Sequence, residues 1–370
     1  MDTQHITLID GSKLTIEALA RAGAEAFVGY PITPSNLMYA YAKRRMPYFF
    51  AAPDEITTLQ WMAGLAATGK MPVTSSAFPG IALMTESINM AYAMELPMVI
   101  VITQRLGPST GSATTGAQGD LLFLKGIISG GYPVPVFSPS DYTDIWTLAA
   151  KAVETAIKYR TPVFFLTSKE MIMTQKTFDL ASLPPIQRHR IPEEYPEDFL
   201  PYKPAENLTP AHVYLGNDRL LTRITASTHD QTGFIRKNEP EALQNTVRLQ
   251  QKLTENLDDY LFYDYIRGEK PAEKLIVSYG ITAEAVRDAV KSLQEKGIPA
   301  DVLIIKTLLP VSPVLTELVQ GYPEVIFAEE NYNGQLKEIF FGAQTPPFVK
   351  QVNKIGEMIT PEEIVQTVLN

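Results

Sequence analysis

The stretch from Phe27 to Asn36 holds residues whose types and order could do chemistry. Apolar residues over 26–30 predict a strand, and Pro31 ends it because proline has no backbone N–H to donate. Pro34 then suits the first turn of a helix. The hydroxyl of Thr33 is therefore expected beside the free N–H groups of a helix start, where an anionic group can bind. The same turn also fits a plain connection between a strand and a helix.

Two further strand ends offer charged side chains. Asp54 is a suitable N-cap for a helix that begins at Glu55, where the helix dipole favours an acid even without a catalytic role. Arg105 follows an apolar strand and is a candidate bidentate clamp for a carboxylate or phosphate, or a partner in a surface salt bridge. The Gly-, Ser- and Thr-rich loop 106–120 comes next, and its residues could cradle an anion.

The elements that must position these residues alternate between strands and helices of ten or more residues. This alternation predicts a parallel sheet whose carboxyl strand ends meet at one edge, where Thr33, Glu55 and Arg105 converge. In this part of the chain we expect strands at 26–30, 48–52, 72–75, 98–102, 134–137 and 163–167, and helices at 14–21, 37–45, 55–68, 81–94 and 142–159.

The alternation stops near residue 176 and resumes near residue 271. Between them we expect an extended surface segment over 183–204, which is rich in Pro and Glu, and then a helix over 241–265. The renewed alternation in the last part of the chain predicts a second α/β unit. We expect its strands at 274–278, 301–306 and 325–328 and its helices at 282–295 and 361–368. We therefore divide the chain into residues 1–175, 176–270 and 271–370.

The composition of the 370 residues excludes several classes of function. A formal charge of −9 does not suit a surface for nucleic acid or anionic lipid. The chain has no cysteine, so it supplies no disulfide, thiolate nucleophile or cysteine-ligated cluster, and its four histidines lack the spacing of a metal site. Neither a secretory signal nor an apolar run long enough to span a bilayer is visible. We expect a cytoplasmic protein without a membrane or nucleic-acid partner.

Several motifs in this order resemble the α subunit of 2-oxoacid:ferredoxin oxidoreductases, especially the 2-oxoglutarate type. The resemblance covers most of residues 10–175 and continues more weakly to the C-terminal unit. It implies a parallel-sheet α/β domain like the pyrimidine-binding domain of thiamine diphosphate enzymes, followed by an α/β domain like the C-terminal domain of transketolase. The motifs that carry it are Tyr30-Pro31-Ile32-Thr33-Pro34-Ser35, Asp54-Glu55-Ile56, Pro79-Gly80 with Leu83-Met84-Thr85-Glu86, Gln104-Arg105 with Gly107-Pro108-Ser109-Thr110-Gly111, Gln118-Gly119-Asp120, Ser227-Thr228-His229-Asp230 and Glu330-Asn331-Tyr332-Asn333-Gly334-Gln335.

The resemblance assigns roles to individual residues. Glu55 matches the glutamate that hydrogen-bonds the aminopyrimidine ring of thiamine diphosphate and favours the tautomer that creates its nucleophilic carbon. Such a carboxyl must be protonated, or share its proton, in a largely dry site. Thr33 and Arg105 would hold the C1 carboxylate of the 2-oxoacid. The remaining residues implied to contact the cofactor are Pro31, Ile32, Phe78, Ser109 and Thr110.

The chain lacks motifs that the same enzymes need elsewhere. No Gly-Asp-Gly…Asn segment of the kind that binds Mg²⁺ and diphosphate is present, because Gly119-Asp120 is followed by Leu121. The resemblance therefore implies that thiamine diphosphate is shared with a β subunit, which brings the Mg²⁺ site and a [4Fe–4S] cluster. It also implies separate γ and ferredoxin-like subunits, CoA as acyl acceptor, ferredoxin as electron acceptor, and a dimer of heteromers.

Two positions depart from the family pattern and leave the substrate open. Pro53 replaces the usual polar residue, and Phe78 adds bulk in a turn where relatives have Thr-Ser-Gly-Pro-Gly. Besides the oxidative decarboxylation of a 2-oxoacid to an acyl-CoA, two other functions remain open. One is a subunit of another split thiamine diphosphate lyase or transferase without a ferredoxin step, and the other is a non-catalytic paralogue that serves assembly.

Overall fold

The computed structural model describes residues 6–370. Its first unit is built on a seven-stranded sheet in the order β12-β6-β7-β5-β4-β2-β3, in which every pairing is parallel except the antiparallel edge pair β12–β6. The predicted parallel sheet is therefore confirmed. Its strands are β2 (Ala26–Gly29), β3 (Tyr48–Ala51), β4 (Pro72–Ser76), β5 (Met98–Gln104), β6 (Val136–Phe137), β7 (Pro162–Ser168) and β12 (Thr307–Leu309).

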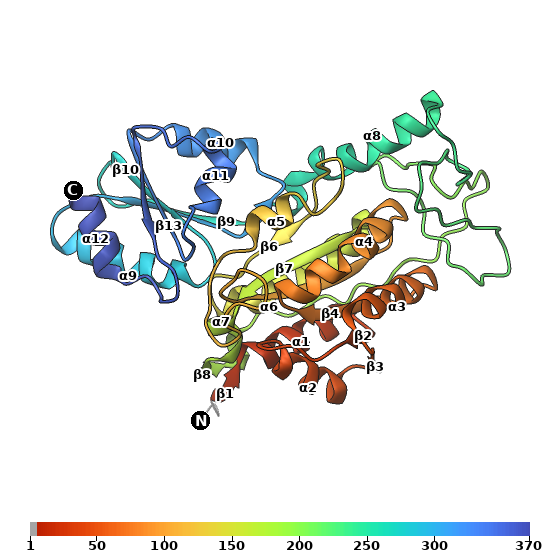
Figure 1. Ribbon diagram of the computed structural model, residues 1–370, viewed down its shortest axis with the longest axis horizontal. Coiled ribbons are helices and arrows are strands. Elements are labelled where there is room, and N and C mark those ends of the chain that lie inside the picture. Colours follow the sequence, from red (N-terminus) through yellow and green to blue (C-terminus); the bar gives the residue numbers. More distant parts are fainter. Residues whose placement is uncertain (1–5) are drawn as a thin grey trace.

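Helices cover both faces of this sheet (Figure 1). Helices α1, α2 and α6 pack together on one face, and α3 and α4 pack together on the other. Asp10, Asp54 and Asp141 each accept a backbone N–H at the start of a helix. Helices α3 and α6 therefore begin where the sequence predicts, whereas α1 begins at Gly11, three residues before its predicted start. The helices are α1 (Gly11–Ala22), α2 (Asn36–Arg45), α3 (Glu55–Ala67), α4 (Phe78–Ala93), α5 (Leu121–Lys125), α6 (Tyr142–Tyr159) and α7 (Lys169–Met173).

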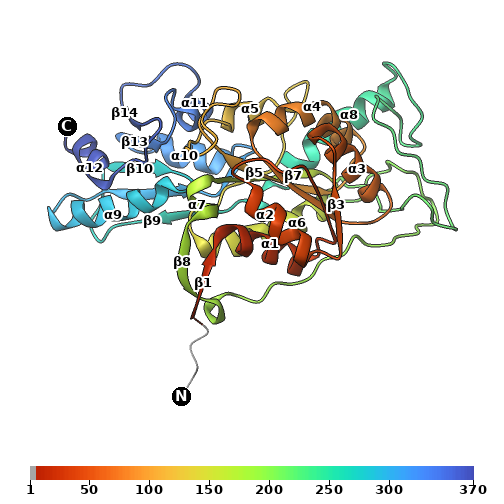
Figure 2. The ribbon, with the colours of Figure 1, turned by 60° about the horizontal axis from the view of Figure 1, so that its bottom comes forward.

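A long irregular segment leads from the first unit to the rest of the chain. Strand β8 (Gln175–Asp179) pairs with β1 (Ile6–Asp10) in a small antiparallel sheet, and a 3-10 turn over Leu180–Ser182 follows. The chain then runs without helix or strand along the first unit to its far end, as Figures 1 and 2 show. Helix α8 (Pro240–Thr254) brings it back towards the C-terminal sheet.

Helix α8 is fixed to the first unit by a buried ion cluster. Glu95, between α4 and β5, accepts hydrogen bonds from the guanidinium of Arg248 and from Lys252 Nζ at 2.6 Å. These cations, both on α8, hold the pKa of the Glu95 carboxyl well below its usual range against the effect of its complete burial. Removing one partner from such a cluster is expected to be strongly destabilising, because a buried charge would lose its counter-charge.

The C-terminal unit is a second, five-stranded sheet in the order β14-β13-β10-β11-β9. Only β9 runs antiparallel to its neighbour. The strands are β9 (Tyr263–Ile266), β10 (Lys274–Ser278), β11 (Asp301–Ile305), β13 (Glu324–Glu329) and β14 (Val349–Asn353), and the helices are α9 (Thr282–Glu295), α10 (Pro313–Gln320), α11 (Gln335–Phe341) and α12 (Pro361–Leu369).

Strands β1, β8 and β14 and helices α5, α7, α10 and α11 were not predicted from the sequence, and two further features differ from the prediction. The helix predicted over 241–265 ends at Thr254; a 3-10 turn over Leu257–Tyr260 and strand β9 follow, because pairing with β11 stabilises an extended chain there. Strand β12 leaves the C-terminal part and completes the sheet of the first unit. The division at residues 175 and 270 therefore cuts across strand pairings and stays a prediction. Within residues 6–370, no helix combines the length and the apolar character needed to cross a membrane.

Candidate active site

The hydroxyl of Ser35 connects three strand ends of the first sheet. It lies 3.0 Å from the carbonyl of Ser76, the last residue of β4, and 2.9 Å from the hydroxyl of Thr103 in β5. Ser35 itself follows β2 through the turn that contains Thr33. These hydrogen bonds join the corner that contains Thr33 to the ends of β4 and β5, the second of which leads to Arg105; no hydrogen bond of the described residues joins them to Glu55.

Arg105 extends from the end of β5 into the turn after β2. Its guanidinium Nη1 donates a hydrogen bond of 2.5 Å to the backbone carbonyl of Thr33, and the side chain is buried. The Thr33 hydroxyl accepts a hydrogen bond of 3.1 Å from the amide of Asn36. Within residues 6–370, Nε of Arg105 has no hydrogen-bond partner, and burial lowers the pKa of the guanidinium. The structure thus brings Thr33 and Arg105 together and leaves a donor free on the arginine.

Glu55 begins α3 and packs against the first turn of α4. The helix start is fixed by Asp54, whose carboxylate accepts the N–H of Thr57 at 2.7 Å. A Cβ atom at Gly80 would lie 2.8 Å from Glu55 Cγ and 2.2 Å from Ser76 Oγ, closer than such atoms normally approach. Glu55 is 8% exposed. Glycine at position 80 is therefore required for the carboxyl group to lie where it does.

Three other predicted site residues lie around this corner. Pro31 is exposed and Ile32 half-buried in the turn after β2. Phe78 is the half-buried first residue of α4 and makes an edge contact with Phe123 of α5, with ring centroids 5.2 Å apart. The bulk of Phe78 is therefore held by α5. A role of these residues towards a cofactor stays a prediction.

Ser109 and Thr110 lie at the exposed tip of the loop after Arg105. The loop closes on itself, because the N–H of Ser112 donates to the carbonyl of Leu106 at 2.9 Å. Ser109 has a positive φ of 56° and Gly111 one of 48°, and a Cβ at Gly111 would lie 1.7 Å from the carbonyl oxygen of Leu106. Among the residues described, the structure records no hydrogen bond between this tip and Glu55 or Thr33. The predicted contact of Ser109 and Thr110 with a cofactor remains a prediction.

Gln118 joins the other end of this loop to the C-terminal sheet. Its amide donates to the carbonyl of Tyr279 at 2.9 Å, and its side-chain oxygen accepts the N–H of Glu330 at 2.7 Å and the hydroxyl of Thr282 at 3.0 Å. Its backbone N–H donates to the carbonyl of Glu330 at 2.8 Å. The motifs that contain Gln118 and Glu330 both belong to the family resemblance described above, but the sequence does not predict that these motifs touch.

Two buried carboxyl groups at this junction have strongly shifted pKa values. Burial raises the pKa of Asp120 to about 7, and the charge of Arg105 opposes this shift. Burial likewise raises the pKa of Glu330 to about 7, against a hydrogen bond from the N–H of Ile359. Neither was a predicted site residue. Such shifts mark candidate functional groups when they occur beside a binding site.

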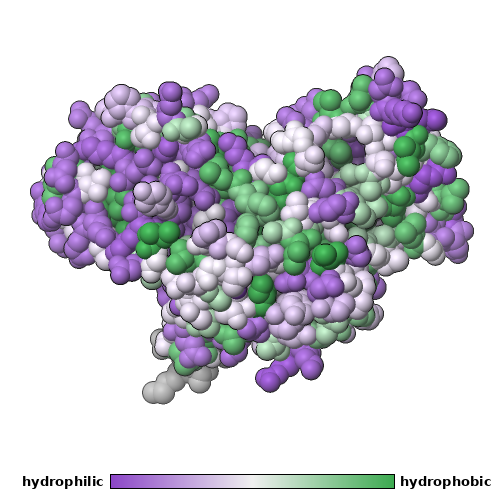
Figure 3. All heavy atoms as spheres, in the orientation of Figure 1, coloured by the Kyte–Doolittle hydropathy of each residue, from purple (hydrophilic) through white to green (hydrophobic). Residues whose placement is uncertain are grey.

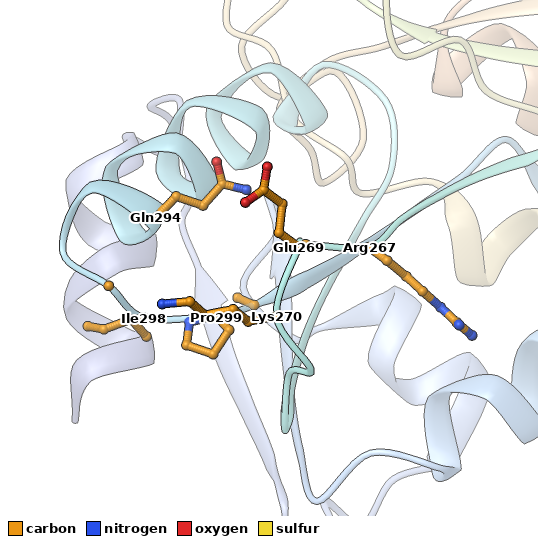
Figure 4. Close-up of a pocket in the computed structure, with 9 residues that line it drawn as sticks. Arg267, Glu269, Lys270, Gln294, Ile298 and Pro299 are labelled. Atoms are coloured by element: carbon orange, nitrogen blue, oxygen red, sulfur yellow. The ribbon is translucent and has the colours of Figure 1, made fainter.

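A separate pocket lies in the C-terminal unit, away from the predicted site residues (Figure 4). It has a volume of about 400 Å³ and lies at the amino end of β11. The carboxyl ends of β11 and of its parallel neighbour β10 lie on the opposite side. Its polar side chains come from Arg267, Glu269, Lys270 and Gln294. It contains neither Glu55 nor Arg105, so it is not part of the arrangement described above.

Known proteins resemble the chain over nearly its whole length. Residues 17–249 match the family described as "Pyruvate flavodoxin/ferredoxin oxidoreductase, thiamine diP-bdg". The 2-oxoglutarate synthase subunit KorA of Methanocaldococcus jannaschii is 31% identical, and the match covers 98% of this chain and 99% of that protein. The ketoisovalerate oxidoreductase subunit VorB of Methanothermobacter thermautotrophicus is 29% identical over 94% of this chain and 93% of that protein.

Solved structures agree with this relationship. A 2-oxoglutarate:ferredoxin oxidoreductase from Magnetococcus marinus, with 2-oxoglutarate, coenzyme A and succinyl-CoA bound, superimposes with a TM-score of 0.89 at 25% identity. The match covers all of this chain and 66% of that one. A split-gene transketolase, described as an inactive β4 tetramer, shares the fold at a TM-score of 0.53 and 17% identity, over 98% of this chain and 97% of that one. The chain therefore belongs to the thiamine diphosphate-binding family of pyruvate flavodoxin/ferredoxin oxidoreductases, as an α subunit of the 2-oxoacid:ferredoxin oxidoreductase type.

Proposed function

We propose that this chain works with a partner subunit to convert a 2-oxoacid and coenzyme A into an acyl-CoA and CO₂, with two electrons passed to ferredoxin. The observation that carries the proposal is the buried guanidinium of Arg105, held by the carbonyl of Thr33 at the sheet edge where Glu55 also lies. 2-Oxoglutarate is our first candidate substrate, since the related KorA proteins are named 2-oxoglutarate synthase subunits.

Arg105 and Thr33 form the proposed site for the C1 carboxylate of the substrate. A planar guanidinium suits a carboxylate because it can donate two parallel hydrogen bonds. One donor, Nη1, is occupied by the Thr33 carbonyl, and this contact fixes the orientation of the group. The Thr33 hydroxyl lies in the same turn and can donate to the second carboxylate oxygen. A carboxylate held at two points leaves its keto carbon in a defined position for attack.

Glu55 is the proposed catalytic residue of this chain. Thiamine diphosphate, when bound, supplies the carbon nucleophile that attacks the keto group of the substrate. The chain fits this cofactor at Glu55, because the carboxyl is largely buried and packs on the bare backbone of Gly80. There it would hold a proton on Oε1 or Oε2, shared with the ring nitrogen of the aminopyrimidine, and keep water from that proton. Pro31, Ile32 and Phe78 would line the cofactor.

Exposed apolar side chains around Glu55 support a β subunit as the partner on this face. Ile56 follows Glu55 directly and is 43% exposed, Leu83 of α4 is 53% exposed, and the ring of Trp61 packs edge-on against Phe50 on the sheet edge. Apolar side chains gathered in this way are typical of a subunit interface. Figure 3 shows the C-terminal unit largely hydrophilic and the first unit less so on the face drawn.

The β subunit would supply what this chain does not. We assign to it the diphosphate-binding half of the site with its Mg²⁺ and a [4Fe–4S] cluster that takes the electrons. Separate γ and ferredoxin-like subunits would complete a dimer of heteromers in the cytoplasm. The alternatives are a split thiamine diphosphate lyase or transferase without ferredoxin, and a non-catalytic assembly subunit.

Co-purification followed by a substrate screen tests the proposed function. The tagged chain is expressed with the gene products that accompany it, and the complex is assayed anaerobically for reduction of a viologen dye with CoA and a series of 2-oxoacids. We expect CoA-dependent dye reduction, with 2-oxoglutarate among the accepted substrates. A product formed without dye reduction would identify a non-redox thiamine enzyme, and a complex that turns over no 2-oxoacid would leave only the assembly role.

A further inference from the structure

Asp120 and Arg105 are two buried groups of opposite charge at the same sheet edge. Each side chain is 6% exposed. Within residues 6–370, Oδ2 of Asp120 and Nε of Arg105 have no hydrogen-bond partner. Buried polar groups without partners are costly, and they are rare unless a water molecule, an ion or a ligand completes them. The two side chains also interact electrostatically, so these two atoms indicate a place for a small polar ligand.

Hydrogen bonds hold the backbone around Asp120 from two sides. Its N–H lies 3.4 Å from the side-chain oxygen of Gln104, the residue before Arg105. From the C-terminal unit, the amide of Gln335 donates to the carbonyl of Gly119 at 2.8 Å and accepts the N–H of Leu122 at 3.0 Å. The residues on both sides of Asp120 are therefore fixed.

Two residues outside its own loop, Arg105 and Tyr279, interact electrostatically with Asp120. Arg105, at the end of β5, is the cation that opposes the rise of the Asp120 pKa to about 7, which burial causes. Tyr279, at the end of β10, has a pKa raised by burial and then by the charges of Glu329, Asp120 and Glu330. Glu329 is the last residue of β13, and Glu330 follows it. Arg105 is thus the cation that the structure couples to Asp120.

A substrate carboxylate at Arg105 changes the charge balance around Asp120. An anionic Asp120 and an anionic substrate would share one buried cation, and like charges in a site of low dielectric constant disfavour double ionisation. A neutral Asp120 removes this repulsion, and its O–H becomes a hydrogen-bond donor. The proton has to come from solvent, because the ligand arrives as an anion.

We propose that Asp120 is a positioning residue for the substrate carboxylate: it takes up one proton from solvent when that carboxylate binds at Arg105, and so leaves a single anion beside the guanidinium. This inference rests on the proposed function of Arg105. It makes substrate affinity depend on pH through a residue that does not itself carry out the decarboxylation.

Calorimetry on the assembled enzyme loaded with thiamine diphosphate tests the proposal. The probe is oxamate, an unreactive analogue of the carboxylate and keto group of a 2-oxoacid, titrated in two buffers of different ionisation enthalpy. We expect an uptake approaching about one proton per site near pH 8, which falls towards zero near pH 5, where Asp120 is already protonated. Asp120→Asn, which is neutral and of the same shape, should bind oxamate without proton uptake at either pH.

The pH dependence of KM gives a second readout. For the enzyme with Asp120, KM for the accepted 2-oxoacid should rise by up to about tenfold per pH unit above neutrality, whereas Asp120→Asn should change by less than about twofold. Glu330→Gln is the matched control, because Glu330 is also a buried carboxyl with a pKa of about 7, and it should keep the proton uptake.

Each of the remaining possible results contradicts one particular step of the proposal. Oxamate binding without proton uptake, or uptake that persists in Asp120→Asn, would refute the role of Asp120. Uptake lost in Glu330→Gln instead would assign the proton to Glu330. If oxamate does not bind at all, the carboxylate site at Arg105 is wrong and the inference fails with it, while turnover of 2-oxoacids separately tests the proposed function.

Discussion

The guanidinium of Arg105 is held by the backbone carbonyl of Thr33, at 2.5 Å, and not by its hydroxyl. The contact joins the residue after β5 to the turn after β2, so two corners of the sheet are held together. A main-chain acceptor does not depend on the side chain at position 33. The two residues can therefore be tested separately.

Arg105→Lys should lower kcat/KM for every accepted 2-oxoacid, although the charge is kept. A lysine ammonium can replace one hydrogen bond, but it cannot both hold the Thr33 carbonyl and donate two parallel bonds to a carboxylate. Loss of one hydrogen bond to a charged group corresponds to about 1.5–3 kcal/mol. Steady-state kinetics on the assembled complex measures the effect.

Thr33→Val and Arg190→Lys are the controls for this variant. Thr33→Val keeps the backbone carbonyl and removes only the hydroxyl, so its loss should be smaller. Arg190 is exposed, and its replacement should leave kcat/KM unchanged. If Arg105→Lys and Thr33→Val both retain the original kcat/KM, neither residue binds the carboxylate.

Glu55→Gln should abolish most of the activity without preventing assembly. The amide has nearly the same shape, but it cannot accept and return a proton, and this kind of assistance contributes roughly 10²–10⁴-fold. Turnover is measured on complexes whose subunit content and cofactor content match those of the original enzyme. A loss smaller than about threefold would remove Glu55 from the mechanism.

Glu330→Gln should stabilise the protein more at high pH than at low pH. Its folded pKa of about 7 lies above the usual value of 4.5, so the folded state favours the neutral form. The stability from this group is present below about pH 4.5 and is lost as the pH rises through 7, at about 1.4 kcal/mol per pKa unit. Glutamine cannot ionise and avoids the loss.

Thermal unfolding at pH 5 and pH 8 measures this difference. The gain in Tm from Glu330→Gln should be larger at pH 8. Glu362→Gln is the control, because Glu362 is exposed on α12 and its replacement should not change the pH dependence. An equal change in Tm at both pH values would show that Glu330 does not titrate between them.

The sequence was most informative where local rules decide the structure. The predicted bounds of α6, β10 and α9 agree with the structure at both ends, since apolar periodicity and the Asp141 cap act over a few residues. Strands β9 and β12 were not predicted because pairing with β11 and β6, far along the chain, keeps these short segments extended.

For the candidate site, the predicted parallel sheet indicated that the corners of Thr33 and Arg105 meet, because the carboxyl ends of parallel strands share one edge. The sequence could not show that Gln118 links the loop after Arg105 to the C-terminal sheet. Nor could it reveal the shifted pKa of Asp120, which depends on burial by residues distant in the sequence. Contacts between units depend on tertiary packing, for which a single sequence has no periodic signal.

Gly80→Ala tests whether the position of Glu55 matters for catalysis. The added Cβ would lie 2.2 Å from Ser76 Oγ and 2.8 Å from Glu55 Cγ, so the carboxyl group must move. Because small displacements of a catalytic group are costly, we expect kcat to fall by about tenfold or more. Kinetics and Tm are measured on the same preparation.

The matched control is Gly64→Ala, in the same helix as Glu55. A Cβ at Gly64 would meet no atom within 4 Å, so this change adds only helix propensity, worth about 0.8–1 kcal/mol in favour of the helix. Gly64→Ala should raise Tm slightly and leave kcat unchanged. If Gly80→Ala assembles normally and turns over at the original rate, the contact between Gly80 and Glu55 is not needed to place the carboxyl. Equal losses of kcat in both variants would mean that α3 as a whole, and not this contact, is sensitive to added bulk.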